Sequence, residues 1–354
     1  MTDLEKLCSR VTEAADCAVI TDDVNRRYFT AMKSSAGTLV VFPEKAYFII
    51  DFRYIEKAKK TVTACEVILQ DKLYEQINSL IEKHGAKTVS VNADTCTLSE
   101  LIAYQQKLNA EVIADTKLAE IIREIRTVKS QEQIDKIIKA QRIAEKGFAH
   151  MLDFIKVGKT EKEIQLELDY YMLKNGAEAL SFDTIALSGS NTSLPHGVPS
   201  DKKVESGEFV LMDFGATYDG WHSDMTRTVC VGKPSDKMKS VYETVLTAQL
   251  SALDAVKAGM SGKALDKIAR DIITDAGYGD NFGHSLGHGV GVEIHESPYA
   301  SPSREDILPE NSIVTIEPGI YLEGKFGVRI EDFVVVTENG CINMTKAPKE
   351  LICL

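Results

Sequence analysis

Two apolar runs surround an Asp-Gly pair in FVLMDFGATYDGWHSDMTRTV, residues 209–229. Asp219-Gly220 is typical of the two-residue turn that joins antiparallel strands, so this segment is predicted to form a β-hairpin. In that register Asp213 lies opposite Thr226, and Asp224 lies diagonally across on the same face. An acid in such an apolar run is costly to bury unless it is paired or binds a metal. For either Asp taken alone, an ion pair with an arginine is the favoured explanation.

A second hairpin is predicted from IVTIEPGIYLEGKFGVRIEDFV, residues 313–334. Centring its turn on Gly324 places Glu317 directly opposite Glu331. Two carboxylates that face each other across a sheet destabilise it unless a cation or a shared proton lies between them. Two hairpins that each carry a pair of inward acids are therefore hard to explain as solvated surface.

Three of the seven histidines fall within GHSLGHGVGVEIHE, residues 283–296. His284 and His288 have the i, i+4 spacing of a helical zinc motif, but the glycines around His288 disfavour a helix, and that interpretation is rejected. Glycine allows close approach of the backbone to a ligand, so His288 is predicted to reach into a crowded site. Taken alone, a Gly-His-Gly segment is more often an ordinary loop histidine.

These segments together supply four carboxylates and one imidazole as candidate metal ligands: Asp213, Asp224, His288, Glu317 and Glu331. A hard, oxygen-rich set favours Mn²⁺ or Co²⁺ and is compatible with Fe²⁺ or Zn²⁺, and four acids carry enough charge to hold two divalent ions. Two ions about 3.5–4 Å apart would activate a water molecule and polarise a carbonyl group. The predicted chemistry is the hydrolysis of an amide or an ester.

The length of 354 residues predicts two domains. Residues 1–127 alternate helical patterns with short β-branched runs, which lie near residues 19–20, 38–42, 46–50 and 88–91. This alternation is typical of an α/β domain. Residues 128–354 are predicted to form the second domain, and a helix capped by Ser130 and Gln133 opens it, with an apolar stripe that continues to Ile155.

The second domain contains an internal repeat. One helix is predicted to follow Thr160 and end at Gly176, and another to follow Ser261 and end at Gly277, which lies 101 residues after Gly176. Each helix is followed by a carboxylate-rich hairpin. Two similar halves are predicted to pack about a pseudo-two-fold axis in an α+β domain, and a chance match of helix ends is the alternative.

Composition excludes several classes of partner. The net charge is −12 and the pI is near 5.2, and Lys and Arg are interleaved with acids, which argues against nucleic acid. The N-terminus has no signal-peptide core, and no stretch approaches the ~20 apolar residues of a membrane span, so a cytoplasmic protein without membrane contact is expected. The seven cysteines are scattered and form no CxxC pair, which predicts reduced thiols.

Five motifs in this order resemble those of the pita-bread metallopeptidases, at residues 212–215, 223–228, 287–291, 316–319 and 328–332. The separate N-terminal α/β domain is similar to the creatinase/prolidase N-terminal domain. With Leu194-Pro195-His196-Gly197 it narrows the resemblance to Xaa-Pro dipeptidases (prolidases) and Xaa-Pro aminopeptidases. The resemblance covers the full length and is closest to the short bacterial enzymes.

The resemblance implies metal-dependent hydrolysis of the peptide bond that precedes proline in short peptides. It implies that Asp213 chelates one metal, that His288 and Glu317 chelate the other, and that Asp224 and Glu331 bridge the pair. Glu317 is also the implied proton shuttle between the attacking water and the leaving proline nitrogen.

Further residues are given roles by the same resemblance. His196 and His295 would line the cleft and hydrogen-bond the substrate and the oxyanion, while Tyr321 and Arg329 would orient the carboxylates. A homodimer is also implied, in which the N-terminal domain borders the cleft of the partner subunit.

Several alternatives stay open. Tyr299 occupies the place of an arginine that, in some dipeptidases, suits the free carboxylate of the substrate, so an Xaa-Pro aminopeptidase acting on longer peptides is the main alternative. A non-catalytic peptide-binding module, or a creatinase-like protein without metal, would be expected to have lost ligands that are all present here. A methionine aminopeptidase shares the ligands but is poorly matched by the N-terminal domain and by His196.

Overall fold

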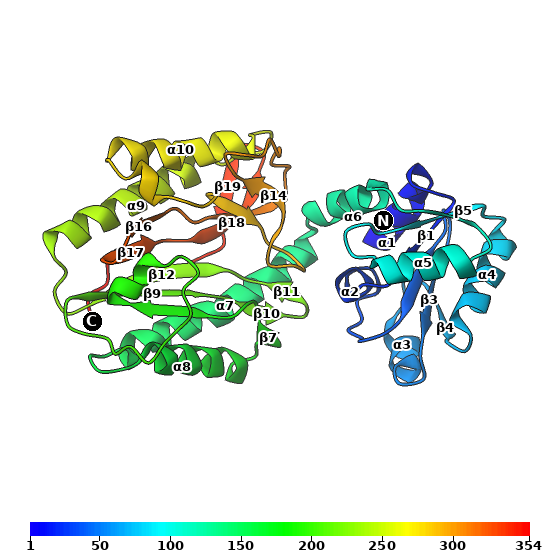
Figure 1. The fold of residues 1–354 in the computed structure, drawn as a ribbon, viewed down its shortest axis with the longest axis horizontal. Helices are drawn as coiled ribbons and strands as arrows, with labels where there is room; N and C mark the ends of the chain where they lie inside the picture. The colour runs from blue at the N-terminus through cyan, green and yellow to red at the C-terminus, as the bar shows by residue number, and fades with distance from the viewer. The chain divides into compact units, whose positions relative to one another are not determined.

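The computed structural model describes residues 1–354 and divides the chain into two units, Met1–Arg126 and Thr127–Leu354 (Figure 1). The division falls one residue before the boundary expected from the sequence. No helix in the chain is both long enough and apolar enough to cross a bilayer.

The N-terminal unit is built on one six-stranded sheet with the order β4-β3-β2-β1-β5-β6. Its strands are β1 Cys17–Ile20, β2 Thr38–Val41, β3 Ala46–Ile50, β4 Glu66–Leu69, β5 Thr88–Val91 and β6 Glu111–Ile113. Its helices are α1 Asp3–Arg10, η1 Val11–Glu13, α2 Asp23–Thr30, α3 Ile55–Thr61, α4 Leu73–His84, α5 Leu98–Lys107 and α6 Lys117–Thr127. The four predicted β-branched runs are all strands, and the α/β class is confirmed.

The two strands that the sequence pattern did not indicate, β4 and β6, lie at the edges of this sheet. The central strands β1, β2 and β3 are buried along their whole length, whereas β4 and β6 contain only exposed and half-buried residues. An edge strand needs no continuous apolar run, because much of its surface faces water.

The C-terminal unit combines four long helices with short antiparallel sheets. Its helices are α7 Gln131–Phe154, α8 Glu161–Lys174, η2 Gly189–Ser193, α9 Asp236–Ala255, α10 Gly262–Asp275 and η3 Gly279–Asn281. Its strands are β7 Ala179–Leu180, β8 Ile185–Ser188, β9 Glu208–Phe214, β10 Ala216–Tyr218, β11 Trp221–His222, β12 Met225–Val231, β13 Gly287–Gly289, β14 Glu296–Ala300, β15 Ile313–Ile316, β16 Gly319–Leu322, β17 Phe326–Arg329, β18 Asp332–Thr337 and β19 Gly340–Asn343. Capping boxes open α7 at Ser130 and α8 at Thr160, as predicted.

The predicted internal repeat is visible in the backbone around α8 and α10. Gly158 and Gly259, which precede these helices, have φ angles of +90° and +80°, a region that favours glycine. Their N–H groups donate at 2.9 Å to the Val204 and Leu308 carbonyls, so the two halves make the same local contact.

Each half of the repeat buries its strands against its own helix pair. The α7–α8 pair packs on the sheet that contains β9 and β12, through Phe148, Met151, Leu168 and Met172. The α9–α10 pair packs on the sheets that contain β15 to β18, through Val241, Val245, Leu265 and Ala269. Burial of each large apolar side chain contributes about 1.5–3 kcal/mol. Figure 1 shows the two helix pairs bordering the strands on opposite sides, with the hairpins between them.

Candidate metal centre

The first hairpin has the predicted register. Asp213 on β9 pairs with Thr226 on β12, and Asp224 comes directly before β12. The turn residues Asp219 and Gly220 both have positive φ angles, +50° and +82°, as a tight hairpin turn requires. The two aspartates therefore project toward a common space from neighbouring strands.

The second hairpin also has the predicted register, although its ladder is interrupted. Ile316 pairs with Asp332 on one side of the interruption, and Gly319 pairs with Arg329 on the other. Glu317 and Glu331 therefore stand opposite each other in the gap, where Pro318 offers no N–H to continue the ladder. The Glu331 N–H instead donates to the Thr226 carbonyl at 3.1 Å, which joins the two hairpins.

His288 sits on the short strand β13 rather than on a helix, so the rejection of the helical zinc motif is confirmed. A Cβ atom added at Gly287 would lie 1.9 Å from the Thr315 carbonyl oxygen, so only glycine permits this approach. The His288 N–H donates to Thr315 Oγ1 at 3.1 Å, and Nδ1 lies 3.0 Å from the Gly289 carbonyl oxygen. The ring therefore presents Nε2 to the acids.

All five predicted ligands line one cavity of about 470 Å³. His288 Nε2 lies 3.3 Å from Glu317 Oε1 and 3.6 Å from Asp224 Oδ2. Asp224, His288 and Glu331 each offer a ligand atom within 4.8 Å of the other two. These are distances at which side chains share a cation, and each of the three residues is buried.

Three buried carboxylate oxygens in this cluster accept no hydrogen bond: Asp213 Oδ1, Asp224 Oδ1 and Glu331 Oε1. A buried, unpaired carboxylate oxygen costs free energy that a neighbouring cation would recover. The donor set is oxygen-rich with one imidazole, which suits a divalent transition metal. The residues present therefore fit a metal centre.

The charges of the cluster are strongly perturbed. Burial, reinforced by the neighbouring carboxylates, raises the pKa of Asp224 and of Glu331 well above the ordinary values. Burial alone would raise the pKa of Glu317, but its hydrogen bond with His288 and the charge of that ring lower it to about 2. Burial lowers the pKa of His288, but the hydrogen bond with Glu317 and the charge of that carboxylate have the larger combined effect. The pKa of His288 therefore rises to about 9.

Arg329 organises one side of the centre. Its guanidinium donates to Asp213 Oδ2 at 2.6 Å, to the Tyr321 hydroxyl at 2.7 Å and to Thr226 Oγ1 at 3.0 Å. Thr226 Oγ1 in turn donates to Glu331 at 2.8 Å. The ion pair considered for Asp213 is therefore present, but it engages Oδ2 and leaves the buried Oδ1 without a hydrogen-bond partner.

Replacing Arg329 with Lys is expected to weaken Mn²⁺ binding by about 10–100-fold, a typical cost when a residue that orients a metal ligand is lost. An ammonium group cannot reproduce the planar fork that reaches Asp213, Tyr321 and Thr226 together. Equilibrium dialysis with Mn²⁺ measures the affinity, and Arg304→Lys, which changes an exposed arginine, is the matched control. Unchanged affinity in Arg329→Lys would contradict the orienting role.

His196 and His295, the other two residues expected at the site, also line the cavity. The ring of His295 meets the ring of His288 edge-on, with the ring centroids 4.3 Å apart. Tyr299 lines the same cavity, and the Arg304 guanidinium lies 4.0 Å from the centroid of its ring. Tyr321 does not line the cavity, but its hydroxyl accepts a hydrogen bond from Arg329, which does.

Two further polar residues of the site were given no role from the sequence, where His284 was considered only as part of the rejected helical zinc motif. His284 hydrogen-bonds the Tyr321 hydroxyl at 2.8 Å and lines the cavity, and burial lowers the pKa of its ring. Thr315 receives the His288 N–H and donates to Glu317 Oε1 at 3.2 Å. The alternation of side chains along the second hairpin could have indicated Thr315, because it lies two residues before Glu317 and therefore on the same face of the strand.

The arrangement combines an anionic, buried pocket for cations with neutral imidazoles beside it. Burial lowers the pKa of His295, which favours a neutral ring that can donate a hydrogen bond without adding charge. Such a centre can bind divalent cations, activate water and hydrogen-bond a carbonyl oxygen. A metal-dependent hydrolase requires these three functions.

Comparisons with known proteins agree with this geometry. Residues 135–338 match metallopeptidase family M24, and residues 4–128 match the creatinase/prolidase N-terminal domain. An Xaa-Pro dipeptidase of Pyrococcus furiosus is 40% identical over 352 residues, which cover 99% of each chain.

Two solved structures resemble the chain over nearly its whole length. An Xaa-Pro dipeptidase from Bacillus anthracis superposes with a TM-score of 0.96 at 41% identity, covering 99% of both chains. An X-Pro aminopeptidase from Thermotoga maritima superposes with a TM-score of 0.91 at 38% identity, covering 96% of this chain and 98% of the other.

Proposed function

This chain belongs to metallopeptidase family M24 and has the pita-bread fold with a creatinase/prolidase N-terminal domain, and we propose that it hydrolyses the peptide bond preceding proline in short peptides. One observation carries the proposal. Four carboxylates and one imidazole converge on a single cavity, and three of their buried oxygens have no hydrogen-bond partner. A peptide-binding module without catalysis has no need to keep such an arrangement.

The proposed ligands are those of the sequence prediction. Asp213 would hold one ion, His288 and Glu317 the other, and Asp224 and Glu331 would contact both. Mn²⁺ or Co²⁺ is the proposed metal, in keeping with the oxygen-rich ligand set. Bound divalent cations would lower the pKa of a water molecule and polarise the scissile carbonyl.

Glu317 is the proposed proton carrier. As an ionised carboxylate, Glu317 would accept the proton that the attacking water loses and deliver it to the leaving proline nitrogen. The Thr315 hydroxyl donates to Oε1 and His288 lies 3.3 Å from the same oxygen, so this side chain is held in one orientation. Neither of these two contacts uses Oε2.

His196 and His295 are the proposed contacts to substrate. Both line the cavity, and a neutral imidazole N–H can stabilise the negative charge that develops on the carbonyl oxygen. Deletion of one such donor typically costs about 10²–10³ in kcat. Their position in the cavity beside the acids supports this role.

The test compares Xaa-Pro dipeptides with Xaa-Pro-Xaa tripeptides, each with Mn²⁺ or Co²⁺ added, and uses Xaa-Ala peptides of the same length as controls. Turnover confined to the proline-containing peptides supports the proposal. Preference for dipeptides identifies a dipeptidase, and preference for the longer peptides identifies an aminopeptidase. The similar structure from Thermotoga maritima is that of an X-Pro aminopeptidase. No turnover of any proline-containing peptide would reject both.

Metal binding is expected to release protons, and apparent affinity should therefore fall as the pH falls from 8 to 6. The raised pKa values of Asp224 and Glu331, and that of His288 at about 9, mean that the metal-free site carries protons that a cation must displace. Each released proton weakens binding by about tenfold per pH unit of acidification. Titration calorimetry in two buffers of different ionisation enthalpy measures the protons released, and a value of zero would contradict this assignment.

A homodimer, with the N-terminal domain next to the cleft of the partner subunit, remains part of the proposal. Its support is membership of the family. Analytical ultracentrifugation across a range of concentrations decides it, and a monomer throughout would exclude it.

A further inference from the structure

Two cysteines far apart in the sequence are paired by the backbone. Cys230 on β12 forms an isolated parallel bridge with Cys353 in the segment that ends the chain. The Cys230 N–H donates to the Ile352 carbonyl at 2.9 Å, and the Leu354 N–H donates to the Cys230 carbonyl at 2.8 Å. Residues paired directly across neighbouring strands project their side chains from the same face, so the two thiols lie side by side.

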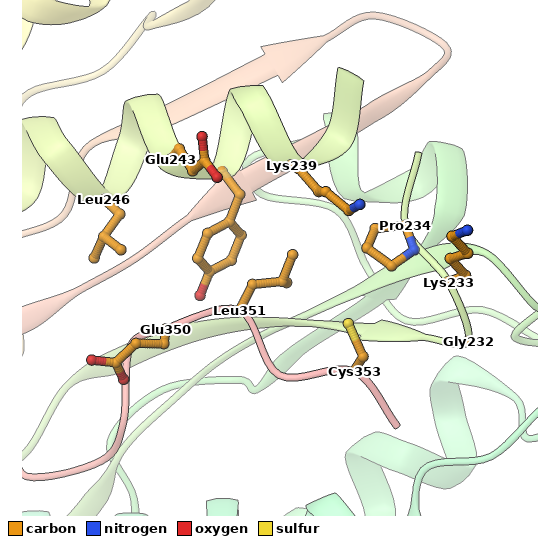
Figure 2. A pocket seen from close by; sticks show the side chains of 10 residues that line it. Gly232, Lys233, Pro234, Lys239, Glu243, Leu246, Glu350, Leu351 and Cys353 are labelled. Carbon is orange, nitrogen blue, oxygen red and sulfur yellow. The ribbon is translucent and has the colours of Figure 1, made fainter. Parts of the chain in front are cut away.

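The two thiols differ in exposure. Cys230 is fully buried in the core beneath α9, with Phe209 and Tyr242 in the same cluster. Cys353 is exposed and lines a second cavity of about 670 Å³, and its sulfur points toward the space between Leu351 and Pro234 (Figure 2). A dissolved reagent can therefore reach Cys353, whereas burial shields Cys230 from it.

Burial, followed by the adjacent Cys353 thiol, raises the pKa of Cys230 to about 11. Cys230 therefore stays protonated at neutral pH and is a poor first nucleophile, since the thiolate is the reactive form. This matches a pair in which the exposed sulfur reacts first and the buried sulfur resolves the product.

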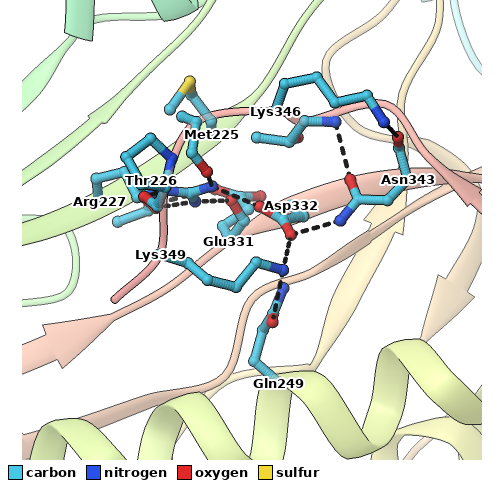
Figure 3. A network of polar contacts seen from close by, with 12 residues as sticks. Met225, Thr226, Arg227, Gln249, Glu331, Asp332, Asn343, Lys346 and Lys349 are labelled. Atoms are coloured by element: carbon cyan, nitrogen blue, oxygen red, sulfur yellow. Dashed lines mark hydrogen bonds and ion pairs between the residues drawn. The ribbon is translucent and has the colours of Figure 1, made fainter. Parts of the chain in front are cut away.

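The segment that carries Cys353 also reaches the back of the metal centre, as Figure 3 shows for Lys349. The Lys349 ammonium pairs with the buried Asp332 and bonds Gln249 at 3.3 Å. The Arg227 side chain donates to the Pro348 carbonyl at 2.8 Å and to the Glu331 carbonyl at 2.6 Å. Arg227, which lies on β12, therefore contacts both this segment and the backbone of Glu331.

We propose that Cys230 and Cys353 form an intramolecular disulfide when the protein meets a peroxide. Cys353 Sγ attacks one oxygen of hydrogen peroxide and becomes a sulfenic acid, and the first water leaves. Cys230 Sγ then attacks the sulfenic sulfur, the S–S bond forms, and the hydroxyl leaves with the thiol proton as the second water. Two thiols are oxidised by two electrons, and one peroxide is reduced to two waters.

The cross-link closes a loop of more than 120 residues. A loop of that length restricts the unfolded chain strongly, so oxidation is expected to raise the melting temperature by about 5–10 °C. The rise should disappear on treatment with a thiol reductant.

The experiment uses the purified full-length protein with Cys353→Ser and Cys341→Ser as companions. Each protein is treated with hydrogen peroxide, quenched with catalase, alkylated and digested without reduction, and its peptides are mapped by mass spectrometry. Cys341 is a half-buried thiol bonded to the Leu253 carbonyl, so Cys341→Ser removes a thiol and leaves the pair intact.

A peptide that joins Cys230 to Cys353 is expected in the wild type and in Cys341→Ser, with the reversible rise in melting temperature in both. Cys353→Ser should show neither. Cys353 recovered as thiol, sulfinic acid or a bond to another cysteine, with Cys230 still open to alkylation after denaturation, would overturn the proposal. An equal shift in melting temperature in Cys353→Ser would overturn it too.

Discussion

Replacement of Asp224 with Asn is expected to lower metal-dependent activity by more than about 10–100-fold, the range for loss of a residue that only orients a metal ligand, and to make the metal-free protein more resistant to heat. Both effects come from the same position. Burial, followed by the charges of Asp213 and Glu317, raises the pKa of Asp224 and makes its ionised form costly in the absence of a cation. Asn has the same shape as Asp but carries no negative charge. The substitution therefore removes both the repulsion from the neighbouring carboxylates and the attraction for a metal ion.

Differential scanning fluorimetry with EDTA and with Mn²⁺ measures this effect. The wild type should gain stability with Mn²⁺, whereas Asp224→Asn should start higher in EDTA and gain little. Asp266→Asn is the matched control, because Asp266 is buried but accepts hydrogen bonds from Arg270 and from the Leu286 N–H. That variant should lose stability in EDTA. A loss of stability in metal-free Asp224→Asn would contradict the account of the cluster.

Replacement of Glu317 with Gln is expected to lower kcat by about 10²–10⁴-fold, the range for loss of a general base. Gln preserves the size of the side chain but cannot accept the proton of the attacking water. Because its carbonyl oxygen can still face a cation, some metal binding should survive, so the loss in kcat should exceed what saturating Mn²⁺ restores.

Steady-state kinetics on an Xaa-Pro peptide at saturating Mn²⁺ separates the two roles of Glu317. Glu323→Gln, an exposed position at the turn of the same hairpin, is the control and should change neither kcat nor KM. Full recovery of kcat in Glu317→Gln at high Mn²⁺ would show that Glu317 only binds metal and moves no proton.

Most of the backbone around the site could be predicted from the sequence, because turn chemistry fixes the register. Asp219-Gly220 and Gly324 adopt positive φ angles, and each sets the pairing of the strands that it joins. Since side chains alternate along a strand, the register then decides which acids face each other. The pairing of Glu317 with Glu331 followed in this way.

What the sequence did not reveal depends on contacts between separate hairpins. Arg329 reaches Asp213 from another hairpin, and Thr226 donates to Glu331 in the same way. The side-chain periodicity of one segment does not indicate which residues of another hairpin it contacts. It left the ion pair and the metal as competing explanations for Asp213, and the three-dimensional arrangement shows one oxygen in the ion pair and the other buried without a hydrogen-bond partner.

The most direct test is the number of Mn²⁺ ions bound per chain, measured by equilibrium dialysis of the wild type and of Glu331→Gln at pH 8. Two ions per chain in the wild type are expected, with at least one lost in the variant, because Glu331 is a proposed ligand of both ions and has a buried oxygen without a hydrogen-bond partner. Binding of no Mn²⁺ by the wild type, or equal binding by the two proteins, would contradict the assignment of this cluster as a metal centre.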